Sequence, residues 1–157
     1  MDDLNHLFAL YSDPEIRKYF VEGVLTLEET KAGLERQVRG YPRYPGLGMW
    51  AMIYKGTGTF IGRCGLLPCE IDDKPEVEIS YLLDKTFWHP GLATEAAQGI
   101  LNYGFENLNL TRIVGLIAPG NIASQSVTER IGMILERKVD GIAGDNYPTL
   151  IYATTRK

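Results

Sequence analysis

Apolar residues recur at helical spacing near the start of the chain. Positions three or four apart predict one face of a helix that ends near Ser12, formed by Leu4, Leu7, Phe8 and Tyr11. Asp13-Pro14 interrupts this helix, because a residue that precedes proline is pushed out of the helical region. Residues 15–20 are then expected to form another short helical piece.

The first residues of a second helix are recognisable in the sequence. Thr26-Leu-Glu-Glu29 is a capping-box sequence, in which two side chains bond the free amides of a first helical turn. The helix is expected to run to about Gly40, with Leu27, Leu34 and Val38 facing inward. Residues 41–46 contain two prolines and a glycine, so we interpret them as an aromatic-rich loop.

Apolar and polar residues alternate in the middle of the chain, which predicts strands. Residues 49–54 and 59–67 form a predicted hairpin, because the segment between them contains two glycines. Residues 68–75 are polar and acidic and predict a second turn, which leads to a third strand at 76–83. In this strand one face carries Val77, Ile79, Tyr81 and Leu83, and the other carries Glu76, Glu78, Ser80 and Leu82.

The second half of the chain predicts helices and strands in turn. Its elements are a strongly patterned helix at 93–108, a strand at 112–117, and a hairpin of 133–139 and 149–154 around a loop at 140–146. Asn121 is expected to cap a short helix that Gly132 ends. No repeat or linker divides the sequence, so we expect a single domain over residues 1–157. Its predicted fold class is α+β, with a mixed, mostly antiparallel sheet flanked by helices.

The charge of the chain narrows the classes of partner. Sixteen basic and twenty acidic residues leave a net charge of -4, which argues against a surface for nucleic acid or an anionic membrane. No apolar run is long enough to cross a bilayer, and the start lacks the basic region of a signal peptide, so the expected location is the cytoplasm. Two cysteines and two histidines argue against a metal site or a disulfide.

The turn Trp88-His-Pro-Gly-Leu-Ala93 leads from a strand into a helix. Gly91 lets the backbone approach a ligand closely, and the amides of Gly91, Leu92 and Ala93 can donate to phosphate oxygens at the positive end of the helix dipole. Pro90 cannot donate. Glycine also begins helices that bind nothing, so the turn alone leaves both interpretations open.

Three successive blocks of the sequence resemble those of a known family. Glu78-Ile-Ser-Tyr-Leu-Leu-Asp84, Phe87-Trp-His-Pro-Gly-Leu-Ala-Thr-Glu-Ala96 and Asn121-Ile-Ala-Ser-Gln-Ser-Val-Thr-Glu-Arg-Ile-Gly-Met133 resemble blocks of the GNAT N-acetyltransferases, and most closely their RimJ/RimL branch. Leu10-Tyr-Ser-Asp-Pro-Glu-Ile16 resembles the first helix of that branch. The resemblance implies a GNAT-like acyl-CoA N-acyltransferase fold whose usual first strand is missing here. Either this sequence lacks that strand, or the strand of a neighbouring subunit covers the exposed edge.

The resemblance also implies a site for acetyl-CoA and no metal. The backbone of Leu82 and Leu83 would bind the pantetheine arm, and Asn121 and Ser124 would lie near the pantetheine and the thioester. The pyrophosphate would be held by the turn, namely Trp88, His89, Gly91, Leu92, Ala93 and Thr94.

Candidate catalytic residues follow from what acetyl transfer to an amine requires. Glu78 matches a glutamate of the branch and is the candidate general base, directly or through a water, and Glu76 is a weaker substitute on the same face. The alternative for Glu78 is an exposed or ion-paired carboxylate of a strand. A backbone N–H near Leu82 would stabilise the oxyanion.

The proton donor to the leaving thiolate is left open. Thr128 stands where many family members have a tyrosine, and Ser124 is the nearest hydroxyl. The alternatives are a serine that bonds its own backbone, with water as the proton source. His89 lies inside the phosphate turn, so it is expected to contact the cofactor or solvent rather than to act as a base.

The expected function is transfer of an acetyl group from acetyl-CoA to a primary amine in a ternary complex. The amine would be a protein N-terminus or a small molecule, and the protein is a possible homodimer. Two alternatives stay open: a non-catalytic module that binds acyl-CoA, and an oligomerising fragment whose open sheet edge pairs with another chain.

Overall fold

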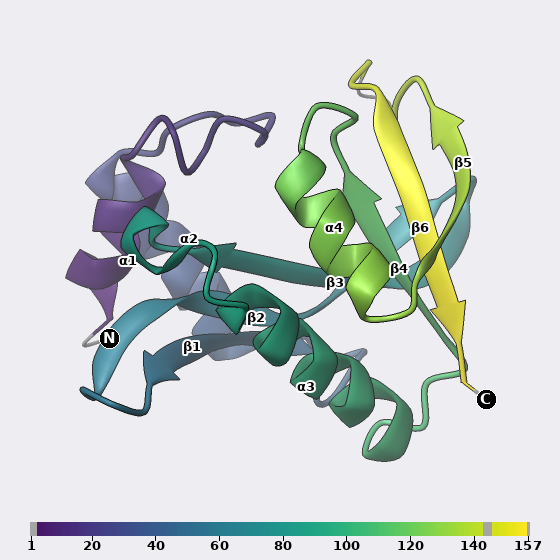
Figure 1. Ribbon diagram of the computed structural model, residues 1–157, viewed down its shortest axis with the longest axis horizontal. Helices are drawn as coiled ribbons and strands as arrows, with labels where there is room; N and C mark the ends of the chain where they lie inside the picture. Colours follow the sequence, from purple (N-terminus) through teal and green to yellow (C-terminus); the bar gives the residue numbers. More distant parts are fainter. Residues whose placement is uncertain (1–2, 143–145, 157) are drawn as a thin grey trace.

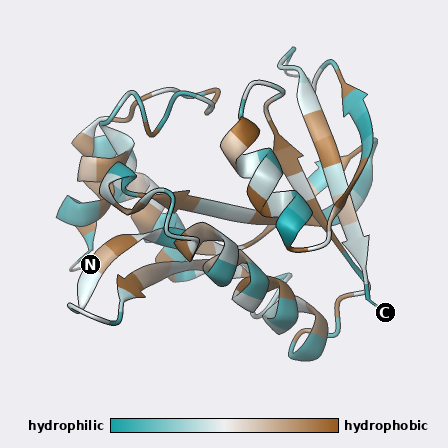
Figure 2. Ribbon diagram, viewed as in Figure 1, coloured by the Kyte–Doolittle hydropathy of each residue, from teal (hydrophilic) through white to brown (hydrophobic). Residues whose placement is uncertain are grey.

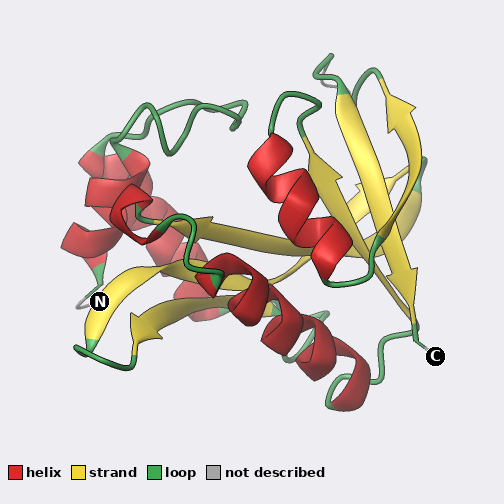
Figure 3. Cartoon of the chain, in the orientation of Figure 1, coloured by secondary structure: helices red, strands yellow, loops and turns green. Residues whose placement is uncertain are grey.

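A computed structural model describes residues 3–142 and 146–156 of the chain (Figure 1). Its helices are α1 Leu4–Tyr11, α2 Leu27–Arg39, α3 Leu92–Glu106 and α4 Ile122–Arg130, with a short 3-10 helix η1 at Lys85–Phe87. Its strands are β1 Gly48–Tyr54, β2 Thr59–Ile71, β3 Lys74–Leu83, β4 Arg112–Ile117, β5 Ile134–Val139 and β6 Thr149–Thr155. Figure 3 shows helices on both sides of this sheet, which confirms the predicted α+β class. The predicted loop at 140–146 lies partly outside the described residues.

The six strands form a single sheet in the order β1-β2-β3-β4-β6-β5. Every neighbouring pair is antiparallel except β3 and β4, which are parallel. The parallel ladder consists of one residue pair, Glu78 with Val114. Beyond Glu78 the two strands therefore separate, and the sheet opens toward the C-terminal end of β3.

The helices cover the two faces of the sheet unequally. α3 and α4 pack on one face over the main core, in which Leu66, Ile113 and Ala97 are fully buried. On the other face of the first half, Leu10 and Ile16 from the segment around α1 pack against Leu82 of β3. Figure 2 shows that β4, in the interior of the sheet, is apolar along most of its length.

Two predicted boundaries are wrong. The prediction of a turn over 68–75 is corrected to Asp72-Asp73 alone, because β2 continues to Ile71 and β3 begins at Lys74. Both aspartates have positive φ (51° and 58°), which fits a two-residue hairpin connection. Residues 15–20 form hydrogen-bonded turns instead of a helical piece: the amide of Arg17 bonds the carbonyl of Asp13, the amide of Phe20 bonds the carbonyl of Arg17, and the Arg17 side chain donates to the carbonyl of Gly23.

The inward face predicted for α2 is also wrong in part. The capping box is present, but Leu27 and Val38 are exposed and the buried residue is Thr30. The reason is that α2 packs against α1 rather than flat on the sheet. Leu34 and Val38 are consequently directed to a groove that is described below.

Among the described residues no helix is both long and apolar enough to cross a membrane. In the same part of the chain, no group of three or more His, Cys, Asp or Glu side chains is arranged to hold a metal ion.

Candidate active site

A groove of about 1750 Å³ opens where β3 and β4 separate. Its walls come from the turns after α1, from α2, from the C-terminal part of β3, from the start of α3 and from α4. The predicted site residues that line it are Glu78, Leu82, Leu83, Trp88, His89, Gly91, Leu92, Ala93, Thr94, Asn121 and Ser124. The fold therefore brings these residues, which are spread over three separate sequence blocks, to one groove.

The start of α3 presents free amides to this groove. Gly91 is the N-cap residue, in a left-handed conformation (φ 82°, ψ 4°), and no side chain caps the helix. The first helical bond runs from the amide of Glu95 to the carbonyl of Gly91, so the amides of the residues before Glu95 have no partner within the helix. A Cβ atom added at Gly91 would meet no atom within 4 Å. The free amides of residues 91–94 form a cradle at the start of α3. This cradle is open, and its donors are available to an anion.

His89 also has a positive φ, of 80°. A side chain with a Cβ atom rarely adopts this conformation, which costs about 1–2 kcal/mol per residue. His89 is exposed at this position. The turn thus has a positive φ on both sides of Pro90, and the residue that carries strain is His89 rather than Gly91.

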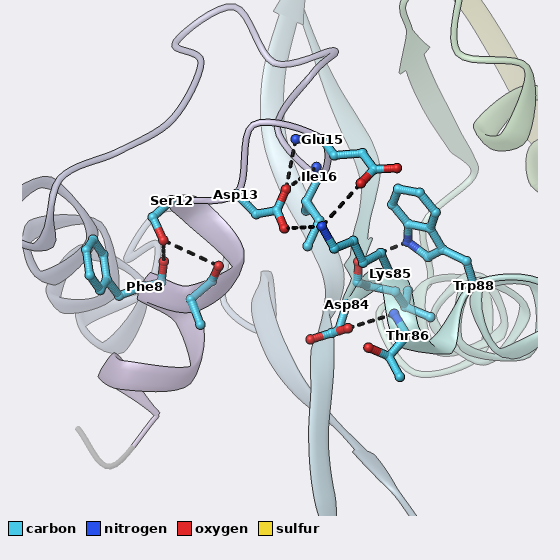
Figure 4. Close-up of polar contacts among 11 residues, drawn as sticks. Phe8, Ser12, Asp13, Glu15, Ile16, Asp84, Lys85, Thr86 and Trp88 are labelled. Carbon is cyan, nitrogen blue, oxygen red and sulfur yellow. Dashed lines mark hydrogen bonds and ion pairs between the residues drawn. The ribbon is translucent and has the colours of Figure 1, made fainter.

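The connection between β3 and α3 is held by polar contacts on several sides (Figure 4). The indole Nε1 of Trp88 donates to the carbonyl of Leu83 at 3.1 Å, and the carboxylate of Asp84 accepts from the amide of Thr86 at 2.8 Å. The Nζ atom of Lys85 lies 2.8 Å from Asp13, which ties this connection to the turns after α1. These contacts fix where the cradle begins.

The free edge of β3 next to the cradle belongs to Tyr81 and Leu83. The amide of Asp84 donates to the carbonyl of Ile61 on β2 at 2.8 Å, and Leu82 pairs with Arg63 two residues along the same ladder. Alternate residues of an antiparallel ladder turn their backbone groups to the same side. Leu82 therefore faces β2, while Tyr81 and Leu83 face the opening toward β4. The carbonyl of Leu83 already accepts from Trp88, so the group of Leu83 that remains available to a ligand is its amide.

Glu78 lies at the point where β3 and β4 separate, and its side chain is partly buried there. Burial raises the pKa of Glu78 from 4.5 to about 7, and the positive charge of Arg63 opposes this shift. No hydrogen bond or ion pair of the Glu78 carboxylate occurs among the described residues. A carboxyl group of this kind is about half ionised near neutral pH, as a general base requires.

Glu76, the substitute base, is occupied by other contacts. Its carboxylate accepts from Nε of Arg112 at 3.1 Å and 3.3 Å. Arg112 also forms a bidentate pair with Glu136, at 2.7 Å for each bond. This network ties β3, β4 and β5 together. It gives Glu76 a structural role and leaves no need to assign Glu76 a catalytic one.

Asn121 and Ser124 start α4 on the far wall of the groove. The side-chain oxygen of Asn121 accepts from the amide of Ser124 at 3.2 Å, which caps the helix as predicted. The hydroxyl of Ser124 makes no hydrogen bond within residues 3–142 and 146–156. It is therefore free to contact a ligand.

Tyr81 and Arg63 are two residues of this groove for which the sequence analysis assigned no role. The Tyr81 hydroxyl donates to the carbonyl of Ser124 and lies 3.1 Å from Oγ1 of Thr128, so it joins β3 to α4 across the opening. Thr128 is itself buried. Arg63 is a single charged residue within an otherwise apolar stretch of β2, which is the signal that could have drawn attention to it.

Sequence comparison identifies relatives over most of the chain. Residues 1–134 match the family model described as acetyltransferase (GNAT) domain. The chain is 35% identical to the uncharacterized protein YkkB of Bacillus subtilis, over 79% of this chain and 71% of that protein. It is 31% identical to the uncharacterized N-acetyltransferase YnaD of the same organism, over 83% of this chain and 73% of that protein.

Solved structures show the same fold. A GNAT-family acetyltransferase from Bacillus anthracis superposes with a TM-score of 0.82 and 25% identity, over 98% of this chain and 89% of that one. Two more distant structures contain coenzyme A. They are the ribosomal alpha-N-protein acetyltransferase RimL (TM-score 0.78, 20% identity, 98% and 89% covered) and the spermidine N-acetyltransferase of Vibrio cholerae, which also contains spermine (TM-score 0.79, 18% identity, 98% and 90% covered).

Proposed function

This chain belongs to the GNAT acetyltransferase family and is an N-acetyltransferase, and we propose that it moves the acetyl group of acetyl-CoA directly to a primary amine in a ternary complex. The acceptor in this proposal is a protein N-terminus or a small-molecule amine. The observation that carries the proposal is the open amide cradle at Gly91, which adjoins the free edge of β3 and the buried carboxylate of Glu78 in one groove.

The cofactor in this proposal lies along the opening between β3 and β4. The amides of Gly91, Leu92, Ala93 and Thr94 donate to the diphosphate, which also meets the positive end of the α3 dipole. The pantetheine amides bond the backbone of Tyr81 and Leu83 as an added strand would. The backbone groups of Tyr81 and Leu83 face the opening while those of Leu82 face β2, which supports Tyr81 over Leu82 as a partner of the pantetheine. The structural neighbours that contain coenzyme A also support this placement of the cofactor.

The chemistry assigns Glu78 the role of general base. As the amine nitrogen forms a bond to the carbonyl carbon of the thioester, Glu78 takes up its proton, directly or through a water. The C–S bond then breaks, and the thiolate of coenzyme A receives a proton from Ser124 or from water. A thiol with an ordinary pKa near 8.5 needs little assistance in leaving, so water is sufficient for this step.

We place the chain in the RimJ/RimL-like branch on the basis of its three sequence blocks. This placement supports an α-amine as acceptor, because an α-amine with a pKa near 8 is partly neutral at pH 7 and a lysine-like amine is not. The distant structural neighbours include one named for a protein N-terminus and one named for spermidine, which agrees with amines of both sizes.

A thiol-release assay with acetyl-CoA tests the proposal. The acceptors are N-terminal peptides, polyamines, amino acids and aminoglycosides, and mass spectrometry of the product identifies the acetylated nitrogen. Release of coenzyme A that depends on an amine supports the proposal. Tight binding of acetyl-CoA in calorimetry without transfer to any amine would instead identify a non-catalytic binding module.

A further inference from the structure

Two arginines lie together in the wall of the groove that contains Glu78. Arg63 comes from β2 and Arg17 from the turns after α1, and both line the groove. Burial is the main reason that the pKa of Arg17 is lowered, and the charge of Arg63 lowers it further. Both guanidinium groups also lie near the ring of Tyr11, at 5.2 Å and 5.4 Å from its centre, so two like charges share this part of the wall.

Arg17 is held in place by an aromatic ring, a hydrogen bond and an ion pair. Its side chain is 5% exposed and lies over the ring of Phe20, at 4.1 Å from the ring centre. Its Nε donates to the carbonyl of Gly23 at 2.7 Å, and its Nη2 lies 3.4 Å from the carboxylate of Glu22. This arginine therefore has a structural explanation, since it closes the turns between α1 and α2.

Arg63 lacks such partners. Its Nε is buried and has no hydrogen-bond partner, and its Nη1 makes one long contact of 3.4 Å to the hydroxyl of Ser80. Its guanidinium lies 5.4 Å from the centre of the Tyr11 ring. Within residues 3–142 and 146–156 it forms no ion pair. A guanidinium offers five donors in a planar fork, and a buried donor without a partner is costly. Carboxylates fit this fork in a bidentate way.

The anion that fits Arg63 is not the diphosphate of the cofactor. Arg63 pairs with Leu82, whose side chain packs against Leu10 and Ile16 on the α1 face of the sheet. Leu92 and Ala93, at the start of α3, pack with Leu83 on the opposite face. An anion at Arg63 therefore belongs to the molecule that enters from the side of α1 and α2, which is the acceptor.

The position of Glu78 sets the distance between the two ends of this acceptor. Arg63 reaches Ser80, which lies on the same face of β3 as Glu78 and two residues away, or about 7 Å along the strand. Two hydrogen bonds of about 2.9 Å each, together with the short distance between the amine and the carboxylate of one amino acid, come to a length of the same order as this spacing along the strand. We infer that the acceptor amine carries a carboxylate close to its nitrogen, with Arg63 binding the carboxylate and Glu78 receiving the amine. This inference rests on the function proposed above.

Matched sets of acceptors test the inference with the wild-type protein. Each set contains an amino acid, its amide and the amine without the carboxyl group, for example L-leucine, L-leucinamide and 3-methylbutylamine. The amine of the amino acid is more basic than that of its amide and is therefore less often neutral at pH 7, so a preference for the amino acid over the amide has to come from the site. We expect kcat/KM for the preferred amino acid to exceed that for its amide by about tenfold to a hundredfold, as a hydrogen-bonded charge pair provides. 4-Methylpentanoate, which lacks the amine, is expected to compete with L-leucine, and its amide is not.

Variants of Arg63 assign this preference to the residue. Arg63→Gln is expected to raise KM for the amino acid, to remove the preference over the amide and to leave the affinity for acetyl-CoA unchanged. Arg63→Lys is expected to restore part of the preference, because it keeps the charge without the planar fork. Arg39→Met is the matched control: it removes an exposed arginine of α2 that does not line the groove, and the preference should persist. Thermal unfolding confirms that each variant is folded.

The outcomes separate this inference from the function on which it rests. Equal or faster transfer to the amides, or to spermidine, would overturn the carboxylate-bearing acceptor and leave the acetyltransferase proposal intact. Persistence of the preference in Arg63→Gln, or failure of 4-methylpentanoate to compete in the wild-type protein, would also overturn it. Absence of coenzyme A release with every amine would contradict both.

Discussion

Replacing Glu78 by glutamine should make the protein more stable at alkaline pH, and by an amount that changes with pH. Burial raises the pKa of Glu78 from 4.5 to about 7, so the folded state holds this proton more tightly than the unfolded state. The carboxylate therefore does not reduce stability at or below pH 4.5, and it reduces the free energy of unfolding progressively as the pH rises toward 7. Glutamine has the same shape and no charge, so it avoids this loss.

The magnitude follows from the shift itself. A difference of about 2.5 pH units at 1.36 kcal/mol each corresponds to about 3 kcal/mol, and some access of solvent through the groove reduces it to about 2–3 kcal/mol. The assay is denaturant unfolding of the wild-type protein and Glu78→Gln at a series of pH values between about 4.5 and 8. The stability of the variant relative to wild type should increase by that amount across the series. Glu70→Gln, on an exposed position of β2, is the control and should show no such trend. Parallel curves for wild type and Glu78→Gln would refute the burial of this charge.

Three further predictions concern the groove and its cradle. Glu78→Gln should lower kcat/KM for the amine by about 10²–10⁴-fold without changing the calorimetric affinity for acetyl-CoA. The rate of the wild-type protein should rise with pH through about 7. A kcat/KM of Glu78→Gln equal to that of the wild type would exclude Glu78 as the base. Gly91→Ala should lower the free energy of unfolding by about 1–2 kcal/mol because of the positive φ of Gly91, whereas His89→Gly should raise it by about 1 kcal/mol, both measured by thermal unfolding. Changes of the opposite sign would contradict the strain assigned to the turn. Tyr81→Phe should destabilise the protein by about 1–2 kcal/mol, because the buried hydroxyl of Thr128 loses its partner; no change in denaturant unfolding would show that the link to α4 contributes nothing.

The strands and helices could largely be predicted from the sequence, because their signals are local. Alternation located both faces of β3, and the capping box of α2 starts the helix as predicted at Thr26. The sequence predicts too broad a turn around Asp72-Asp73, since the flanking polar residues and prolines also suit the exposed ends of β2 and β3. Composition alone does not distinguish an exposed strand end from a loop.

The candidate site was predictable only as far as single segments determine it. The open helix start at Gly91 and the cap at Asn121 follow from a few neighbouring residues. Glu76 and Glu78 look equivalent in the sequence, yet one is paired with Arg112 and the other is buried without a partner. Which strand lies beside β3, and at which register, decides between them, and that information is non-local. The same holds for Arg63, whose lack of partners depends on packing across two strands and the turns after α1.

The single residue pair between β3 and β4 has a mechanical consequence. Most of the connection between the two halves of the sheet is made by side chains and helices rather than by a backbone ladder, so a small rotation of one half against the other breaks few hydrogen bonds. A rotation about this one residue pair would have its axis near Glu78 and Val114. The far end of the opening can therefore widen while the carboxylate at the axis stays almost still, so that a long, flexible molecule can enter or leave without disturbing the group beside which it reacts.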